Sequence, residues 1–384
     1  MRIGISTSVV QRGKSGVGQY VFALLRALLA ARHPHKFVLF VLEEDLPLFA
    51  FAKDKVELVA VPEKFRPPVR NILWHQTTMS KLVRAHRLDV LHIPSYRRML
   101  WSRPCPLVST IHDLAPFHVA EKYDWQRMFY GRVLVRRLAL RQDRIVAISQ
   151  YTAGDIVKFF GVPRERITVI HNGVDHERFR PGSREQAKTE VARRFGLSRP
   201  FFLYVSRLEH PAKNHVRLIS AFEEFKAATA SNWQLAFAGG DWQGAEAIHA
   251  AIRSSKFAVD IRILGFVPDA LLPDLYRAAD VFVYPSLHEG FGLPPIEAMA
   301  CSCPVIASTR GALAEVIGDA AAIVEPEDVH AIANQLRLLA SVESVRNRMK
   351  TVGLEHARKF DWHKTAAETL KLYEDAAGRP DASV

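Results

Sequence analysis

Short apolar runs alternate with amphipathic stretches along the first half of the chain. The runs are short, nearly all apolar and separated by polar residues, which predicts buried strands. The predicted strands are Ile3–Ser6, Phe37–Leu42, Val56–Val61, Val90–Ile93, Leu107–Ile111 and Ile145–Ile148. Helical periodicity between them is clearest at Tyr20–Ala31 and Trp74–Ala85. Because buried strands separated by amphipathic helices form a parallel sheet covered on both faces, we expect a doubly wound α/β domain.

The same pattern starts again after Phe179-Arg180-Pro181-Gly182, a Pro/Gly punctuation that precedes a charged helix at 184–195. The new predicted strands are Phe201–Val205, Gln234–Gly239, Ile261–Leu264, Val281–Tyr284, Val305–Ala307 and Ala321–Val324. The chain therefore divides into an N-terminal Rossmann-like domain, residues 1–180, and a C-terminal one, residues 181–360. A last helix at 361–377 has an aromatic lead-in at Phe360 and Trp362, and it is a candidate to pack back across the first domain.

The composition is that of a globular protein. Of the 384 residues, 48% are hydrophobic and 24% are charged. The chain has no run of roughly 18 or more apolar residues and opens directly into the strand Ile3–Ser6, so we expect neither a membrane-spanning helix nor a secretory signal. The three cysteines, Cys105, Cys301 and Cys303, suit a reducing compartment. We therefore expect a soluble, cytoplasmic protein.

The net charge of +12 is concentrated in the first part of the chain. Residues 1–150 hold 24 Lys and Arg against 11 Asp and Glu, whereas the remainder holds 28 against 29. This asymmetry indicates an anionic partner for the first domain: a membrane surface, a phosphate-bearing substrate or nucleic acid. Nucleic acid is the weakest of these, because no signature of a DNA- or RNA-binding module is present.

The segment Tyr123–Arg144 alternates apolar residues with arginines. This pattern fits a helix on an anionic membrane and equally a domain helix with a solvated arginine face.

Glycines mark the turn after the first predicted strand. Gly16 and Gly18 precede a helix, so the backbone can approach an anion at the helix N-terminus. A tight turn without a ligand is the alternative. The adjacent Gly13-Lys14-Ser15 does not complete a Walker A loop, because the glycine that this motif requires at position 8 is Ser8.

A histidine and an aspartate follow another buried strand directly. His112 and Asp113 come at the carboxyl end of Leu107–Ile111, the edge that lines the ligand crevice in doubly wound sheets. They are therefore candidate binding residues, with a core or capping histidine as the alternative.

The second domain carries a denser group of charged motifs. Arg207 follows the strand Phe201–Val205, and Lys213 comes six residues later. Two cations at a strand end fit a diphosphate, which arginine grips with its planar fork and lysine binds as a point charge. Glu289 leads a Gly-x-Gly loop, and Glu297 lies on the helix that follows. Glycine amides can face a phosphate or sugar, and carboxylates accept hydrogen bonds from sugar or ribose hydroxyls.

Together these motifs resemble those of the family 4 glycosyltransferases of the GT-B fold. The matching segments are Gly16-Val17-Gly18-Gln19-Tyr20, His112-Asp113, Ser149 with Thr152, His171-Asn172-Gly173-Val174-Asp175, Arg207, Lys213-Asn214, Gly265-Phe266-Val267, and Glu289 with Glu297. Their order and spacing cover nearly the whole chain. Gln19 stands where relatives often have arginine, which leaves the acceptor open, and Ser302 stands where glycine is usual, at a helix end.

The resemblance implies retaining transfer of a sugar from a nucleotide-sugar donor held in a cleft between two Rossmann-like domains. The leaving diphosphate would be stabilised by Arg207 and Lys213 and would help to deprotonate the acceptor hydroxyl. The implied catalytic residues are His112, Arg207, Lys213 and Glu289. The implied donor-binding residues are Gly16, Gly18, Arg207, Lys213, Asn214, Phe266, Val267, Glu289, Gly290, Phe291, Gly292, Leu293 and Glu297. The implied acceptor-binding residues are Gln19, Tyr20 and Asp113.

Neither a cofactor nor a metal ion is expected. No Asp-x-Asp motif lies in a suitable loop, Arg207 and Lys213 take the place of the divalent ion, and His33-Pro34-His35 fits a surface loop better than a metal site. The expected partners are the nucleotide sugar and a glycan or lipid-linked acceptor. Peripheral attachment to the anionic inner face of the cytoplasmic membrane is a further hypothesis, and no nucleic-acid partner is expected.

The overall pattern favours mannose transfer from GDP-mannose in cell-surface polysaccharide synthesis, with UDP-hexoses as the alternative donors. A nucleotide-sugar epimerase of the same architecture is a second enzyme hypothesis, but it explains the Glu289–Glu297 loop less well. A degenerate, binding-only relative would have lost the charged donor residues, which are all present.

Overall fold

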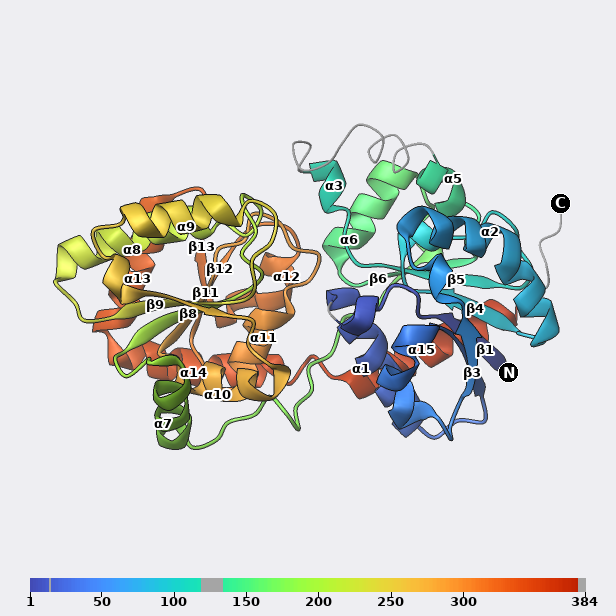
Figure 1. The fold of residues 1–384 in the computed structure, drawn as a ribbon, viewed down its shortest axis with the longest axis horizontal. Coiled ribbons are helices and arrows are strands. Elements are labelled where there is room, and N and C mark those ends of the chain that lie inside the picture. Colours follow the sequence, from blue (N-terminus) through green and yellow to red (C-terminus); the bar gives the residue numbers. More distant parts are fainter. Residues whose placement is uncertain (14, 119–133, 379–384) are drawn as a thin grey trace. The chain divides into compact units, whose positions relative to one another are not determined.

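The computed structural model describes residues 1–13, 15–118 and 134–378. The chain forms two compact units, which are treated separately below (Figure 1). The first comprises Met1–Gly173 together with the segment that begins at Trp362, and the second is Val174–Asp361.

In the first unit the described residues form a seven-stranded parallel sheet of order β3-β2-β1-β4-β5-β6-β7. The strands are β1 (Arg2–Ser6), β2 (Lys36–Leu42), β3 (Glu57–Val61), β4 (Val90–Ile93), β5 (Leu107–Ile111), β6 (Arg144–Ala147) and β7 (Ile167–Val169). Alternate residues of β2 enter cores on opposite faces. Phe37, Leu39 and Val41 pack on one face, and Val38, Phe40 and Leu42 pack on the other, as expected for a sheet covered on both sides.

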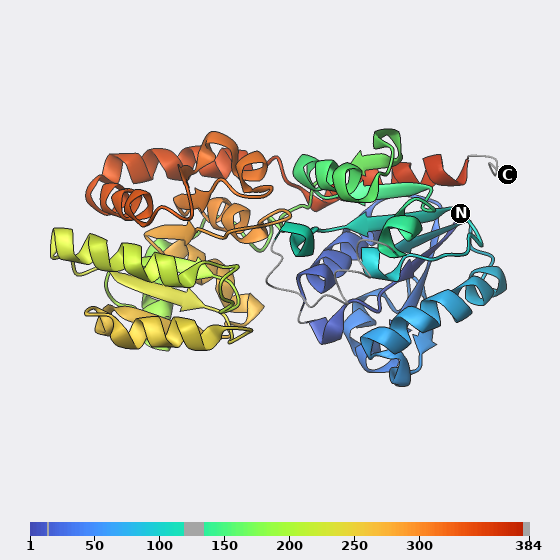
Figure 2. The ribbon, with the colours of Figure 1, turned by 90° about the horizontal axis from the view of Figure 1, so that it is seen from above.

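Two helices distant in sequence cover one face of this sheet. They are α1 (Gly16–Ala30) and α15 (Trp362–Ala377), whose ribbons can be followed in Figures 1 and 2. Their buried side chains belong to one hydrophobic core. From α15, Trp362, Leu372 and Tyr373 enter that core. The opposite face carries α2 (Pro68–Ala85), α5 (Arg136–Ala139) and α6 (Gln150–Asp155).

In the second unit the described residues form a six-stranded parallel sheet of order β10-β9-β8-β11-β12-β13. The strands are β8 (Phe201–Val205), β9 (Gln234–Ala238), β10 (Ile261–Gly265), β11 (Val281–Tyr284), β12 (Val305–Ser308) and β13 (Ala322–Val324). The helices are α7 (Arg184–Phe195), α8 (His215–Thr229), α9 (Ala245–Ser254), α10 (Leu272–Ala278), α11 (Leu293–Ala300), α12 (Leu313–Ile317), α13 (Val329–Ser341) and α14 (Glu343–Ala357). The predicted α/β fold class is confirmed in both units, and every predicted strand is present with ends displaced by at most one residue.

The change of unit lies at Gly173/Val174, whereas the sequence placed it near residue 180. Long-range pairing accounts for the difference. The Val174 amide donates to the Phe360 carbonyl at 3.1 Å, and the Phe179 ring packs on Tyr276. Residues 174–180 therefore belong to the second unit.

Candidate functional site

Each sheet has one point at which the strand order reverses direction. In the first unit it lies between β1 and β4, and in the second between β8 and β11. Loops from such a pair of strands diverge at their carboxyl ends and leave room for a ligand. The predicted charged residues of the second unit follow these strands: Arg207 and Lys213 come after β8, and Glu289 comes after β11.

Arg207 is held on a loop that lies very close to the neighbouring strand exit. A Cβ added to Gly239, after β9, would lie 1.9 Å from the Ser206 carbonyl oxygen, so only glycine fits there. The guanidinium donates to Glu209 Oε2 at 3.1 Å, and its carbon lies 4.7 Å from the centre of the Trp242 ring. The Arg207 side chain is still 53% exposed, so it can reach an anion in solvent.

Lys213 and Glu289 form a mostly buried ion pair. Lys213 Nζ donates to Glu289 Oε1 at 2.5 Å, and the Tyr284 hydroxyl donates to the same oxygen at 3.0 Å. Burial by itself would raise the pKa of Glu289, but the Lys213 charge and these hydrogen bonds hold the pKa below its ordinary value. Glu289 is therefore a carboxylate at neutral pH, and Lys213 is its counter-ion.

A neighbouring turn fixes the backbone of Glu289. The Ala312 amide donates to the Glu289 carbonyl at 2.8 Å, and a Cβ on Gly311 would lie 2.3 Å from that carbonyl oxygen. Gly311 has φ +66°, in the left-handed region that favours glycine. The Gly-x-Gly loop then turns into α11 through Gly292, at φ +92°. Gly290 and Leu293 lie in the same turn.

Glu297, on α11, faces Tyr276 on α10. The Tyr276 hydroxyl donates to Glu297 Oε2 at 3.0 Å. Burial raises the pKa of Glu297 to about 7, an effect that the tyrosine and the charge of Arg178 only partly offset. The two glutamates of the motif therefore differ: Glu289 is charged at neutral pH, whereas Glu297 is near its titration midpoint.

Three of the residues predicted to bind the donor have side chains that pack within the second unit. Asn214 is buried, and its amide donates to the carbonyls of Pro285 at 3.0 Å and Pro326 at 2.6 Å, so it joins two loops. The Phe291 ring is buried against Phe360, and Val267 is only 6% exposed. These side chains shape the fold around the site.

One residue predicted to bind the donor stands out for its exposure. Phe266, after β10, is 76% exposed and presents an aromatic face at the carboxyl edge of the second sheet.

In the first unit the glycines of the predicted anion loop lie inside α1. Ser15 caps the helix by accepting a hydrogen bond from the Gly18 amide at 2.9 Å, so α1 begins at Gly16. A Cβ on Gly18 would lie 2.8 Å from the Val10 carbonyl oxygen, which shows that its small size serves packing within the loop. Gly16 has open space around its Cα, and Gln19 is exposed with its amide donating to the Gly13 carbonyl at 3.1 Å.

His112 is held as a neutral imidazole. Burial lowers its pKa to about 4, against opposing effects of the Asp113 charge and of a backbone hydrogen bond with Pro94. Proline offers only a carbonyl, so the histidine donates in that bond. Nε2 is buried and has no hydrogen-bond partner among the described residues.

Two of the residues predicted to bind the acceptor make contacts within the first unit. Tyr20 is 2% exposed, and its hydroxyl lies 3.2 Å from Thr110 Oγ1. Asp113 Oδ1 accepts from the Ala115 amide at 3.1 Å and caps the turn that follows.

Residues that support the charged groups were missed from the sequence. Trp242 lies under Arg207, Tyr284 binds Glu289, and Tyr276 binds Glu297. Tyr284 ends an apolar strand and Tyr276 lies on an amphipathic helix, so both were interpreted as core residues. Trp242 carried a weak signal, as an aromatic residue just after the Gly239-Gly240 strand exit.

The basic segment Tyr123–Arg144 lies partly outside the described residues. In its described part, Leu138 is core, whereas Arg137 and Arg141 are exposed. Within residues 1–13, 15–118 and 134–378, no helix combines the length and apolar character needed to cross a membrane.

Comparison with known proteins identifies relatives over the whole chain. The family described as "Glycosyltransferase Family 4" matches residues 14–178, and the family described as "Glycosyl transferases group 1" matches residues 186–356. The chain is 28% identical to the O-antigen chain mannosyltransferase B of Escherichia coli, over 97% of this chain and 100% of that protein. It is 32% identical to the D-inositol 3-phosphate glycosyltransferase of Corynebacterium glutamicum (strain R), over 73% of this chain and 68% of that protein.

A solved structure shares the fold. The Anabaena protein HepE, crystallised in complex with UDP and glucose, superposes with a TM-score of 0.77 at 18% identity, over 98% of this chain and 100% of that one.

Proposed function

Because the chain belongs to the family 4 glycosyltransferases, which have the GT-B fold, we propose that it is a retaining transferase of mannose from GDP-mannose. The acceptor is a glycan or lipid-linked sugar in cell-surface polysaccharide synthesis. The relative named O-antigen chain mannosyltransferase B, which aligns over its full length, supports both the sugar and the pathway class.

The observation that carries this proposal is the buried Lys213–Glu289 pair at the strand-order reversal of the second unit. Without donor, each charge neutralises the other. A diphosphate that approaches Lys213 offers it a stronger anionic partner, and Glu289 is then released to accept hydrogen bonds from sugar hydroxyls. Arg207, half exposed on the adjacent loop, adds a second cation for the diphosphate.

These groups suit a transfer in which the leaving group acts as the base. The bond from sugar C1 to the diphosphate oxygen breaks, the bond from C1 to the acceptor oxygen forms on the same face, and the acceptor proton passes to the diphosphate. Negative charge grows on the diphosphate, where preorganised cations are worth several kcal/mol. Neutral His112 accepts a hydrogen bond from a sugar hydroxyl through Nε2. We propose that Arg207 and Lys213 make a metal ion unnecessary.

A lipid-linked acceptor requires contact with a membrane surface, and the described residues of the first unit include a candidate face for it. Val69 and Leu73 on α2 are 69% and 57% exposed, and Trp101 is 47% exposed. Arg141 stacks on Trp101, and the Trp101 amide donates to Gln76 on α2, so these groups are neighbours. Apolar side chains next to an arginine fit an anionic bilayer surface.

Flotation with phosphatidylglycerol vesicles tests this face. The bound fraction should fall in a Leu73→Ser/Trp101→Ser variant and stay unchanged in Val259→Ser, an exposed site of the second unit. Equal flotation of both variants would remove the membrane hypothesis.

A UDP-hexose is the second candidate donor, because the structural relative HepE was crystallised with UDP and glucose. Calorimetric titration of GDP and UDP, each with magnesium or with EDTA, separates the two. We expect GDP to bind more tightly and equally well without magnesium.

Arg207→Ala and Lys213→Ala should each weaken GDP binding about tenfold or more, the loss expected for one charged hydrogen bond. Arg193→Ala, an exposed arginine on α7, is the matched control. Tighter UDP binding would replace the donor, and no binding of either nucleotide would overturn the proposed function.

A further inference from the structure

A buried histidine joins the C-terminal helix to the first sheet. His92, at the end of β4, has Nδ1 2.7 Å from the Tyr373 hydroxyl of α15 and Nε2 2.8 Å from Thr110 Oγ1 of β5. Burial lowers the pKa of His92 to about 3, so the ring is neutral and must donate through one nitrogen and accept through the other. Tyr373 and His92 are 281 residues apart, yet they form one directional hydrogen-bonded pair.

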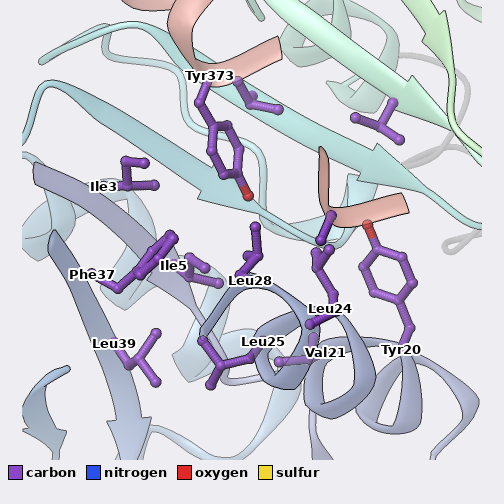
Figure 3. Packing of buried hydrophobic residues seen from close by; sticks show 14 of the residues in the cluster. Ile3, Ile5, Tyr20, Val21, Leu24, Leu25, Leu28, Phe37, Leu39 and Tyr373 are labelled. Carbon is purple, nitrogen blue, oxygen red and sulfur yellow. The ribbon is translucent and has the colours of Figure 1, made fainter. Parts of the chain in front are cut away.

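The same chain of contacts continues to His112. Thr110 Oγ1 lies 3.2 Å from the Tyr20 hydroxyl, and the Tyr20 ring meets the His112 ring edge-on, with centroids 4.6 Å apart and an interplanar angle of 80°. Trp362, the first residue of α15, also packs on Tyr20, with ring centroids 5.8 Å apart. Tyr20 and Tyr373 reach into one core from α1 and α15 (Figure 3).

A second constraint on His112 begins at the same strand end. The Pro94 carbonyl that accepts from His112 lies two residues beyond His92. The Tyr20 ring limits the orientation of the imidazole. Pro94 lies on the strand end that carries His92, and Tyr20 is linked to His92 through Thr110.

We propose that Tyr373 and His92 are positioning residues that orient the His112 imidazole through Thr110, Tyr20 and the end of β4. The C-terminal helix thereby completes the binding site of the first unit. The catalytic consequence rests on the proposed role of His112, whereas the orientation itself can be measured without substrate.

The matched test compares two buried hydroxyls on α15. Tyr373→Phe removes the hydroxyl that binds His92. Thr369→Val removes a buried hydroxyl one turn away, which donates only to the Thr365 carbonyl within the same helix. Both variants lose one buried hydrogen bond, but only Tyr373→Phe changes the contacts that link α15 to His112.

The first measurement is the ring-nitrogen NMR spectrum of His112, identified by its absence in His112→Gln. The wild type should show one dominant tautomer. Tyr373→Phe should shift the His112 resonances or introduce the second tautomer, and Thr369→Val should leave them in place. Unchanged His112 signals in Tyr373→Phe, or equal shifts in both variants, would overturn the proposal.

The second measurement tests whether the contacts from Tyr373 and His92 to His112 affect catalysis. We expect Tyr373→Phe to lower the turnover of GDP-mannose about tenfold, because small misplacements of a reacting group are costly. The Kd for GDP should change less than about twofold, because the donor cations lie in the other unit. Turnover of Tyr373→Phe equal to that of Thr369→Val would contradict the proposal. If wild-type protein binds no GDP, the proposed donor is wrong. The NMR comparison still tests whether Tyr373 and His92 orient His112.

Discussion

At the scale of single residues, Glu297 has a charge that its surroundings control. Burial raises its pKa to about 7 from an ordinary value of 4.5, so between these values the folded protein holds a proton that the unfolded chain releases. The free energy of unfolding should therefore fall as the pH rises through this window. Glu297→Gln, which keeps an oxygen for Tyr276, should remove that part of the pH dependence. Urea unfolding at about pH 5 and about pH 7.5 measures the difference, and identical pH slopes in both proteins would refute it.

Ser302 has a strained backbone conformation at a position where glycine is usual in the family 4 glycosyltransferases. It has φ +59° directly after α11, in the left-handed region that costs a residue with a Cβ about 1 kcal/mol. Ser302→Gly should therefore raise the free energy of unfolding by about 0.5–1 kcal/mol. Ser255→Gly is the contrasting control, because Ser255 ends α9 at φ −71° and its hydroxyl accepts from the Phe257 amide, so that variant should be less stable. Stabilisation of both variants would contradict the strain.

The sequence could place the charged groups of the site but not their partners. Arg207, Lys213 and Glu289 follow buried strands, and strand ends on parallel sheets share one edge, so their proximity is predictable. Tyr20 shows the limit. Its place beside the glycines suggested ligand contact, yet the helix begins at Gly16 and turns Tyr20 into the core.

At the scale of elements, apolar runs predicted strands well because both faces of each sheet are covered. β7, with three residues, offers too short a run to be recognised. Helix starts were less predictable. α1 begins at Gly16, four residues before the predicted Tyr20, because Ser15 caps it through a local polar contact that periodicity does not reveal. α2 begins at Pro68, six residues before the predicted Trp74.

The turn that carries Gly311 should matter for the donor site as well as for stability. Gly311→Ala places a Cβ against the Glu289 backbone, so it should displace Glu289 and weaken GDP-mannose binding more than GDP binding. Gly196→Ala has nearly the same backbone strain, φ +69°, but meets no atom within 4 Å. It should lose only about 1 kcal/mol of stability, with both affinities unchanged. Calorimetric titration of both ligands into both variants makes the comparison, and equal losses of affinity would remove the assigned role of the turn.

At the scale of the whole molecule, the two units differ in how their chain is assembled. The continuous segment Val174–Asp361 holds all four charged residues that we propose bind the donor: Arg207, Lys213, Glu289 and Glu297. The first unit is discontinuous, because its core requires α15 from the end of the chain. Periodicity identified that helix, but amphipathic periodicity alone does not say which sheet its apolar face covers.

Removal of α15 should therefore unfold one unit and spare the other. Trp362, Leu372 and Tyr373 are buried in the first core, and each contributes about 1.5–3 kcal/mol, which together approaches the stability of a typical domain, about 5–15 kcal/mol. A chain ending at Asp361 should lose the melting transition of the first unit and become protease-sensitive within residues 1–173. It should keep GDP binding within about threefold, since Arg207 and Lys213 remain in an intact unit. A chain ending at Gly378 is the control and should melt like the wild type. Retention of both transitions without α15 would show that the first core closes without it, whereas loss of GDP binding would show that the second unit depends on the first.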